Sequence, residues 1–246
     1  MMTTTMDTRI PESAMDTYIR GLIDAAGTQR VPGLFADDRI DAIYRLHNRS
    51  GISVIAVRTT KLNEECLLQI MSFRFGQYLA AGYLNTGLVH DLSLKYEPLS
   101  SVSAGDIHVL AGSAETGEIL CYGSIRELAA APADARMRDS SRPLCRNENV
   151  FGRSAFDHLA ILTKLAVTGV RELGPFVKNQ QKGIHDELAL RAPIETFVAG
   201  TRTFLGPLRS AIQAIIGGLE EAVVKRNMAY FQWPVVVLRA DAFREG

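Results

Sequence analysis

The chain has 246 residues, and 27 Lys and Arg side chains balance 27 Asp and Glu, so the formal net charge is zero. Hydrophobic residues make up 47% of it, a composition typical of a globular protein with its own core. Without a basic excess, nucleic acid is not the expected partner, because phosphate affinity comes from clustered Lys and Arg. No segment approaches the ~18 apolar residues of a membrane-spanning helix. Three widely spaced cysteines fit no disulfide framework, which predicts a cytoplasmic location.

Hydrophobic periodicity predicts an alternation of helices and strands. The predicted elements are, in chain order, helices at 13–26 and 36–47, a strand at 52–59, a helix at 62–81, strands at 106–111 and 118–126, a helix at 154–166, a strand at 170–178, helices at 185–204 and 208–227, and a strand at 233–239. Residues 1–12 are predicted to be disordered and 129–142 to form a loop. This order predicts a mixed α/β sheet rather than a doubly wound parallel one.

Turn signals support parts of this assignment. Asp37 is placed to cap the helix at 36–47, and Gly82 to end the helix at 62–81. The Ser-Ala-Glu-Thr-Gly segment 113–117 predicts a hairpin between two strands. No glycine-rich phosphate loop and no Gly-x-Ser-x-Gly elbow occurs, which argues against dinucleotide-binding, P-loop and α/β-hydrolase folds.

Several motifs together carry a family resemblance. The segment Phe73-Arg74-Phe75-Gly76-Gln77-Tyr78-Leu79 resembles the Arg-x-x-x-aromatic helix of acyl-homoserine-lactone (autoinducer) synthases and long-chain N-acyl amino acid synthases. Both belong to the Gcn5-related N-acetyltransferase superfamily. Three later features are similar to family motifs in the same order, and these are an acidic loop with Asp91 and Tyr96-Glu97, the strand end Gly123-Ser124-Ile125-Arg126, and the fourth strand Arg171-Glu172-Leu173-Gly174-Pro175-Phe176-Val177.

The resemblance spans residues 52–240 and implies an acyl-CoA N-acyltransferase fold over 51–246. Residues 1–50 are then an N-terminal extension, partly disordered and then helical. Two departures stand out. Pro175 replaces the family's arginine, and the acidic loop with Asp91 lacks a second aspartate at the family's spacing.

The implied activity is transfer of an acyl group from a thioester to the amine of an amino acid or similar small metabolite. The thioester, of coenzyme A or of an acyl carrier protein, is a co-substrate, and no permanently bound cofactor is expected. Glu172 is the predicted general base, while Arg74 and Arg126 hold the acceptor's carboxylate or brace Glu172. Tyr78, Asp91, Phe176 and Val177 are the predicted substrate-binding residues. Lys178, Gln180, Gln181 and Gly183 are predicted to bind the pantetheine and phosphates of the donor.

Each of these roles has a plainer alternative. Glu172 could be an edge-strand surface charge, Arg126 a solvated strand end, and the loop at 180–183 an ordinary strand-to-helix turn. Arg74 could form a salt bridge with Glu65 or Asp91. For the whole protein, Pro175 favours a rival interpretation, a non-catalytic or repurposed relative that binds a small ligand or acts as a scaffold.

The remaining reactive residues predict no separate site. Histidines lack ligand spacing, so no metal site is expected, and His108 is expected to be packed and hydrogen-bonded within its strand. Cys121 is expected in the core, and a nucleophilic role for Cys145 has no supporting motif. A carrier protein would need a local basic patch, for which the candidates are Arg136, Arg138, Arg142, Arg146 and Arg153.

Overall fold

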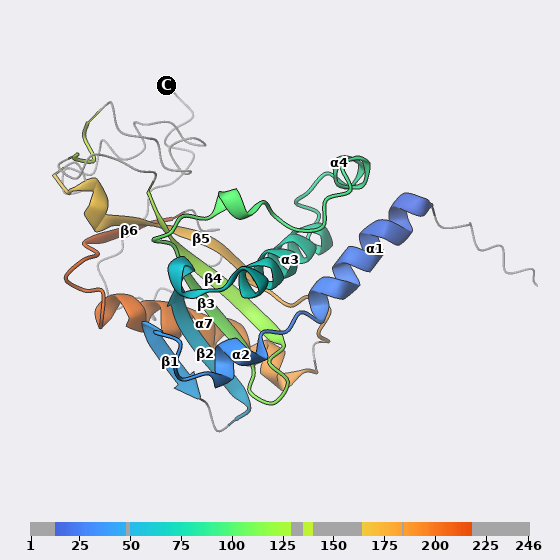
Figure 1. The fold of residues 1–246 in the computed structure, drawn as a ribbon, viewed down its shortest axis with the longest axis horizontal. Helices are drawn as coiled ribbons and strands as arrows, with labels where there is room; N and C mark the ends of the chain where they lie inside the picture. Colours follow the sequence, from blue (N-terminus) through green and yellow to red (C-terminus); the bar gives the residue numbers. More distant parts are fainter. Residues whose placement is uncertain (1–12, 48–49, 129–134, 140–163, 184, 218–246) are drawn as a thin grey trace, which may run out of the picture.

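A six-stranded mixed sheet forms the centre of the computed structural model, which describes residues 13–47, 50–128, 135–139, 164–183 and 185–217 (Figure 1). The strands lie side by side in chain order. They are β1 (Tyr44–His47), β2 (Ile52–Arg58), β3 (Ile107–Ser113), β4 (Ile119–Glu127), β5 (Val170–Lys178) and β6 (Ala214–Ile216). Neighbouring strands are antiparallel, except that β6 runs parallel to β5. The chain therefore has an α/β fold, as predicted.

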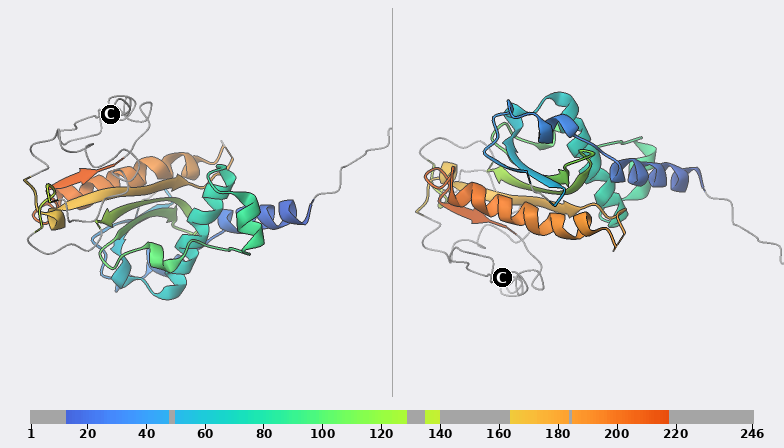
Figure 2. Two further views of the ribbon diagram at one scale, coloured as in Figure 1. Left: turned by 90° about the horizontal axis from the view of Figure 1, so that it is seen from above. Right: turned by 90° about the horizontal axis from the view of Figure 1, so that it is seen from below.

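Helices cover both faces of this sheet (Figure 2). The described α-helices are α1 (Ala14–Gly27), α2 (Pro32–Ala36), α3 (Glu64–Ala80), α4 (Thr86–Asp91) and α7 (Glu187–Leu205). On one face, Ala192 and Ala199 of α7 pack on a buried apolar cluster of β2, β3 and β4. On the other, Ile70, Met71 and Phe73 of α3 pack on a second cluster. We call these the α7 face and the α3 face.

Helix α1 lies on the outer side of α3. At Gly76 a Cβ atom would collide with Ala26, so the two helices approach as closely as glycine permits. An apolar group that includes Ile19, Phe75 and Leu79 fills the rest of the contact. The N-terminus of α1 is capped by Ser13, whose hydroxyl accepts a hydrogen bond from the Asp16 backbone N–H.

Most of the predicted elements are confirmed. The helix at 13–26 is α1, the strand at 52–59 is β2, the helix at 62–81 is α3, the hairpin is β3–β4, the strand at 170–178 is β5 and the helix at 185–204 is α7. Gly82 has a φ of 73° and Gly117, in the hairpin turn, a φ of 69°. These left-handed values explain glycine at both positions.

The helix predicted at 36–47 is wrong. Helix α2 ends at Ala36, Asp37 is its C-terminal cap, and Tyr44–His47 is the edge strand β1, antiparallel to β2. The Arg45 guanidinium donates hydrogen bonds to carbonyls of Phe35 and Asp37, which holds the intervening segment against α2. Pairing with β2 overrides the weak helical spacing of this segment.

The helix predicted at 208–227 is also wrong over the described residues 208–217. Ala214–Ile216 is the strand β6, and its branched Ile215 and Ile216 pair with β5. Leu208 and Ile212 are buried, as the apolar stripe predicted, but Leu208 lies in a turn and Ile212 in the irregular segment before β6. The helix predicted at 154–166 is described only at 164–166, which are not helical. Residues 1–12, the strand at 233–239 and most of the loop at 129–142 lie outside the described residues.

Candidate functional site

The candidate site is centred on β4 and β5, where the register brings two charged residues together. Arg126 of β4 and Glu172 of β5 are directly opposite Cα partners, so their side chains leave the same face of the sheet. Each residue is only 4% exposed. The alternatives of a solvated strand end for Arg126 and a surface charge for Glu172 are therefore wrong.

A β-bulge interrupts the ladder next to this pair. Tyr122 pairs with Val177 and Gly123 with Phe176, but Ile125 pairs with Leu173, so β5 contributes one extra residue near Gly174 and Pro175. Proline lacks the N–H that a regular ladder uses, and a bulge is where a strand tolerates it. Pro175, a departure from the family pattern, is thus accommodated where the pairing is already irregular.

The buried Arg126 guanidinium has no hydrogen-bond partner for its Nη1 and Nη2 atoms among the described residues. The predicted pairing with Glu172 is therefore one of strand register, without a hydrogen bond from these two nitrogens. Ser124, two residues earlier on the same face, is 3% exposed. Its hydroxyl also lacks a hydrogen-bond partner in the described part, although it lies near the Tyr122 phenol.

Ser124 and Arg126 pack directly against the backbone of β5 at Gly174. A Cβ atom there would lie 2.9 Å from Arg126 Nε and would collide with the Ser124 hydroxyl. Glycine is thus required by close approach rather than by backbone conformation. Arg126, Ser124 and the bulge at Gly174 thus form a closely packed polar cluster next to Glu172.

Arg74 is buried on the α3 face, with 1% of its side chain exposed. It donates a hydrogen bond of 2.5 Å from Nη2 to Glu97 Oε2, and its guanidinium carbon lies 5.2 Å from the centroid of the Tyr122 ring. A salt bridge is thus found, but with Glu97 instead of the predicted Glu65 or Asp91. The ion pair and the cation–π contact both engage the Arg74 charge.

His108 of β3 continues this buried layer. One ring nitrogen lies 2.9 Å from the Tyr122 hydroxyl and the other 2.9 Å from Thr59 Oγ1. Burial, with a smaller contribution from the charge of Arg74, lowers the pKa of His108 to about 3. The expectation of a packed, hydrogen-bonded histidine is confirmed.

This histidine should make stability depend on pH. The unfolded chain binds a proton at His108 below pH 6.5 whereas the folded chain does not, so its contribution is complete above pH 6.5 and declines as pH falls toward 3. We expect chemical denaturation to show a loss that approaches about 1.4 kcal/mol per pH unit from this one residue. His108→Gln should flatten the slope between pH 6.5 and 5, whereas His90→Gln, at a partly exposed position, should leave it unchanged. Equal slopes for all three proteins would contradict the assignment.

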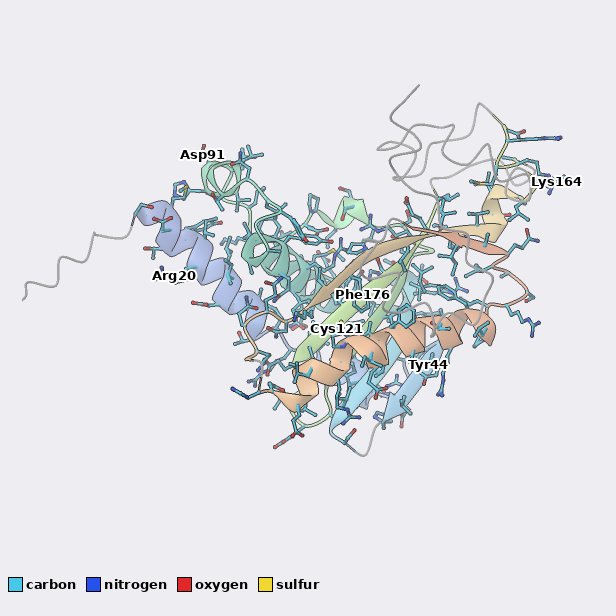
Figure 3. The ribbon with its side chains drawn as sticks, turned by 180° about the vertical axis from the view of Figure 1, so that it is seen from behind. Arg20, Tyr44, Asp91, Cys121, Lys164 and Phe176 are labelled. Carbon is cyan, nitrogen blue, oxygen red and sulfur yellow. The ribbon has the colours of Figure 1, made fainter. Side chains whose placement is uncertain are left out.

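The predicted substrate-binding residues fall into two groups. Tyr78 lies beside Arg74, as one helical turn requires, and burial raises the pKa of its phenol to about 12, so it stays a hydrogen-bond donor. Val177 packs on the α3 face. Phe176 is 45% exposed and covers Gly123 on the α7 face, while Asp91 is exposed on α4, away from the sheet (Figure 3). The structure thus brings Tyr78 and Val177, but neither Asp91 nor Phe176, to the face of Glu172.

The predicted donor-binding residues lie at and after the end of β5. Lys178 is exposed at the last position of the strand. The Gln180 N–H donates to Gln77 Oε1 at 2.8 Å, and the Gln181 side chain accepts from Gln77 Nε2 at 2.7 Å. Gln77 of α3 is fully buried, so it fixes this loop against the helix.

The start of α7 is already occupied by carboxylates. The Asp186 side chain accepts a hydrogen bond from the Ala189 N–H, and Glu187 adds a second negative charge in the first turn. Lys182 forms a salt bridge of 2.6 Å with Glu118. Gly183 has no neighbour that a Cβ would closely approach. The helix dipole is thus directed at a side chain of the protein, which weakens the case for a donor phosphate at this position.

Comparison of the chain with known protein families, with curated proteins and with solved structures finds no match. The site therefore rests on its own geometry. Within the described residues, no group of three or more His, Cys, Asp or Glu side chains could hold a metal ion. In the same part of the chain, no helix is long and apolar enough to cross a membrane.

Sequence reasoning missed two residues, Tyr122 and Ser124. The signal was present in the strand at 118–126, because Tyr122, Ser124 and Arg126 alternate and must share a face. Cys121 points the opposite way and is fully buried, as expected. Of the proposed basic patch, Arg136 and Arg138 are exposed, and the other three arginines lie outside the described residues.

Proposed function

We propose that the protein is an acyltransferase with a sheet of the Gcn5-related type, and that it moves an acyl group from a thioester to an amine. Strand order supports this. Strands β2 to β5 form an antiparallel series with α3 inserted after β2, and α7 then connects β5 to a parallel neighbour, β6. Under this proposal residues 1–50 are an extension that adds α1 to the outside of α3 and β1 to the sheet edge.

The parallel pairing of β5 with β6, after an antiparallel series of strands, carries the proposal. Among the described residues, β6 pairs with Val170, Arg171 and Glu172 of β5. The pantetheine arm would bind along the edge of β5 beyond these residues. A pantetheine arm has amide groups spaced along an extended chain, and it can add hydrogen bonds to such an edge as a strand does. The edge begins at Glu172, so a thioester bound there would have a buried carboxylate close by.

For acyl transfer the protein has to position the thioester and the amine and to supply one proton acceptor. An acceptor amine attacks the thioester carbonyl, a C–N bond forms, the C–S bond breaks, and the thiolate leaves. Glu172 takes the proton that the amine nitrogen loses, directly or through a water, and the departing thiolate is protonated in turn. Proton transfer to a placed base contributes about 10²–10⁴-fold to such reactions.

A donor presented by a carrier protein suits the start of α7 better than free coenzyme A does. The pantetheine arm is common to both, but coenzyme A would bring its pyrophosphate to the Asp186 and Glu187 carboxylates. A carrier protein's phosphate is bonded to the carrier's own chain, and it can stay outside the sheet. The exposed Arg136 and Arg138 are then candidates for contact with an acidic carrier.

The second candidate is a binding protein without acyl transfer. Pro175 and the capped helix start favour it, because both remove hydrogen-bond donors that a thioester could use. Under this alternative the buried polar residues recognise a small ligand but transfer no group.

An assay of thiol release distinguishes the acyltransferase from the binding protein. The full chain is incubated with acyl-CoA and acyl-carrier donors of several lengths and with a panel of amino acids, and free thiol is followed over time. We expect release that requires the amine and is faster with the acyl-carrier donor. If no donor is consumed with any acceptor, the acyltransferase proposal is wrong and the binding protein is the better conclusion.

A further inference from the structure

The end of helix α1 lies against the loop that follows β5. The Asn179 side chain, which is 3% exposed, donates hydrogen bonds to the carbonyls of Gly27 at 2.9 Å and of Ile119 at 3.1 Å. At Gly27 a Cβ atom would lie only 2.8 Å from the Cβ of Gln181, so the helix and the loop are in direct contact. Asn179 therefore links the end of α1, the start of β4 and the end of β5.

Gln77 of α3 holds the same loop through both polar atoms of its side-chain amide. Its Oε1 accepts a hydrogen bond of 2.8 Å from the Gln180 N–H, and its Nε2 donates one of 2.7 Å to Gln181 Oε1. Gln77 is fully buried, so the loss of either hydrogen bond would leave a buried polar group without its partner. We call Gln77, Asn179, Gln180 and Gln181, together with Gly27, the loop network.

The loop network holds one end of the strand edge that we propose for the donor. β6 pairs with Val170–Glu172 at the start of β5, and the network begins at Asn179, directly after the last residue of β5. The Asn179 N–H also donates to the Leu120 carbonyl at 2.8 Å, which extends the contact with β4. A ligand that adds to a strand edge binds through backbone hydrogen bonds, and its affinity depends on how well that backbone is held in place beforehand. The backbone at 173–178 is thus held at both of its ends.

We propose that Gln77 is a positioning residue for the thioester donor and that it acts by fixing residues 179–181 at the end of β5. This role rests on the proposed function, because it requires the donor's pantetheine arm to bind along β5. The family resemblance implies roles for Arg74 and Tyr78 of the same helix but none for Gln77. Helix α1 takes part through Gly27, so it supports the donor end of β5 as well as packing on the outside of α3.

The test measures donor binding separately from acyl transfer. The probe is an S-alkyl pantetheine, a thioether that keeps the amides of the pantetheine arm but has no thioester carbonyl. Its dissociation constant for the full chain is measured by calorimetry, and the KM values of donor and acceptor by thiol release. Gln77→Met keeps the length of the side chain without its hydrogen bonds. It should raise the dissociation constant of the probe and the donor KM about fivefold or more and leave the acceptor KM within about twofold.

Matched variants separate positioning from stability. Gly27→Ala places a Cβ against Gln181 and should weaken probe binding about fivefold, since the loop has to move. Gly21→Ala is the control in the same helix, because nothing lies within 4 Å of its Cβ, and it should bind the probe as the original protein does. Ile70→Val shortens a fully buried side chain of α3 away from the loop network. It should destabilise the protein but leave the donor KM unchanged.

The outcomes distinguish this role from the proposed function. If the original protein binds the probe and releases thiol, but Gln77→Met and Gly27→Ala bind the probe equally well, the positioning role is wrong and the acyltransferase proposal stands. A rise in donor KM that Ile70→Val reproduces would also overturn the role, because stability would then explain it. If the original protein neither binds the probe nor releases thiol, the proposed function is wrong and this role with it. Should Gln77→Met fail to fold, Gly27→Ala carries the test.

Discussion

Glu172→Gln is expected to lower kcat/KM for acyl transfer by about 10²–10⁴-fold, the contribution of a placed general base. Glutamine keeps the size and one oxygen of glutamate but accepts no proton at neutral pH. Glu172 is 4% exposed and is the only carboxylate of β5, the strand that we propose for the thioester. The measurement is thiol release under single-turnover conditions with the best donor and acceptor.

Two controls separate a base from a structural residue. Glu127→Gln changes a carboxylate one register pair away that forms a salt bridge with Arg171, and it should leave the rate within about twofold. Raising the pH should recover part of the Glu172→Gln rate, because the amine then loses its proton to solvent. A Glu172→Gln protein that folds normally and reacts within threefold of the original rate would show that Glu172 is not the base.

The local parts of the fold and site follow from the sequence because they depend on neighbouring residues. Alternation within the strand at 170–178 places Glu172 inward, and β5 has these same limits. The hairpin of β3 and β4 is found where the turn residues predict it, although the register shifts between Ala111 and Gly112. The helix at 62–81 places Tyr78 one turn after Arg74, and this too is found.

The predictions that are wrong concern segments whose structure depends on contacts with distant parts of the chain. The segment 36–47 has helical spacing, but Tyr44–His47 pairs with the edge of β2. The residues of the segment itself do not indicate that this edge lies beside them. Residues 214–216 likewise become a strand because β5 lies beside them. The sequence offers Glu65 and Asp91 as partners of Arg74, whereas its partner in the structure is Glu97, from the segment that follows α4.

The surroundings of Arg126 are the clearest case of a feature that local sequence patterns do not predict. The pairing of Arg126 with Glu172 was open as a possibility, but the bulge at Gly174 and Pro175 is a property of two strands together. That bulge decides what lies beside the guanidinium. The residues of one strand alone do not determine such a shift in the register of its pairing with a neighbouring strand.

Arg74→Ala should destabilise the protein by about 3–5 kcal/mol, the usual cost of removing one partner from a buried ion pair. The change leaves Glu97, whose side chain is 17% exposed, without its guanidinium, and it removes the cation over the Tyr122 ring. The free energy of unfolding, measured with urea at pH 7, reports the loss. Arg39→Ala is the control, because its exposed pair with Asp37 should contribute nothing measurable.

The double variant Arg74→Met with Glu97→Gln shows how much of the lost stability comes from the ion pair and how much from the lost side-chain volume. Methionine fills much of the space of the arginine stem, and glutamine removes the carboxylate charge that faced Arg74, so the double variant should recover at least half of the stability that Arg74→Ala loses. If Arg74→Ala costs less than about 1 kcal/mol, the ion pair with Glu97 is not a buried one in solution.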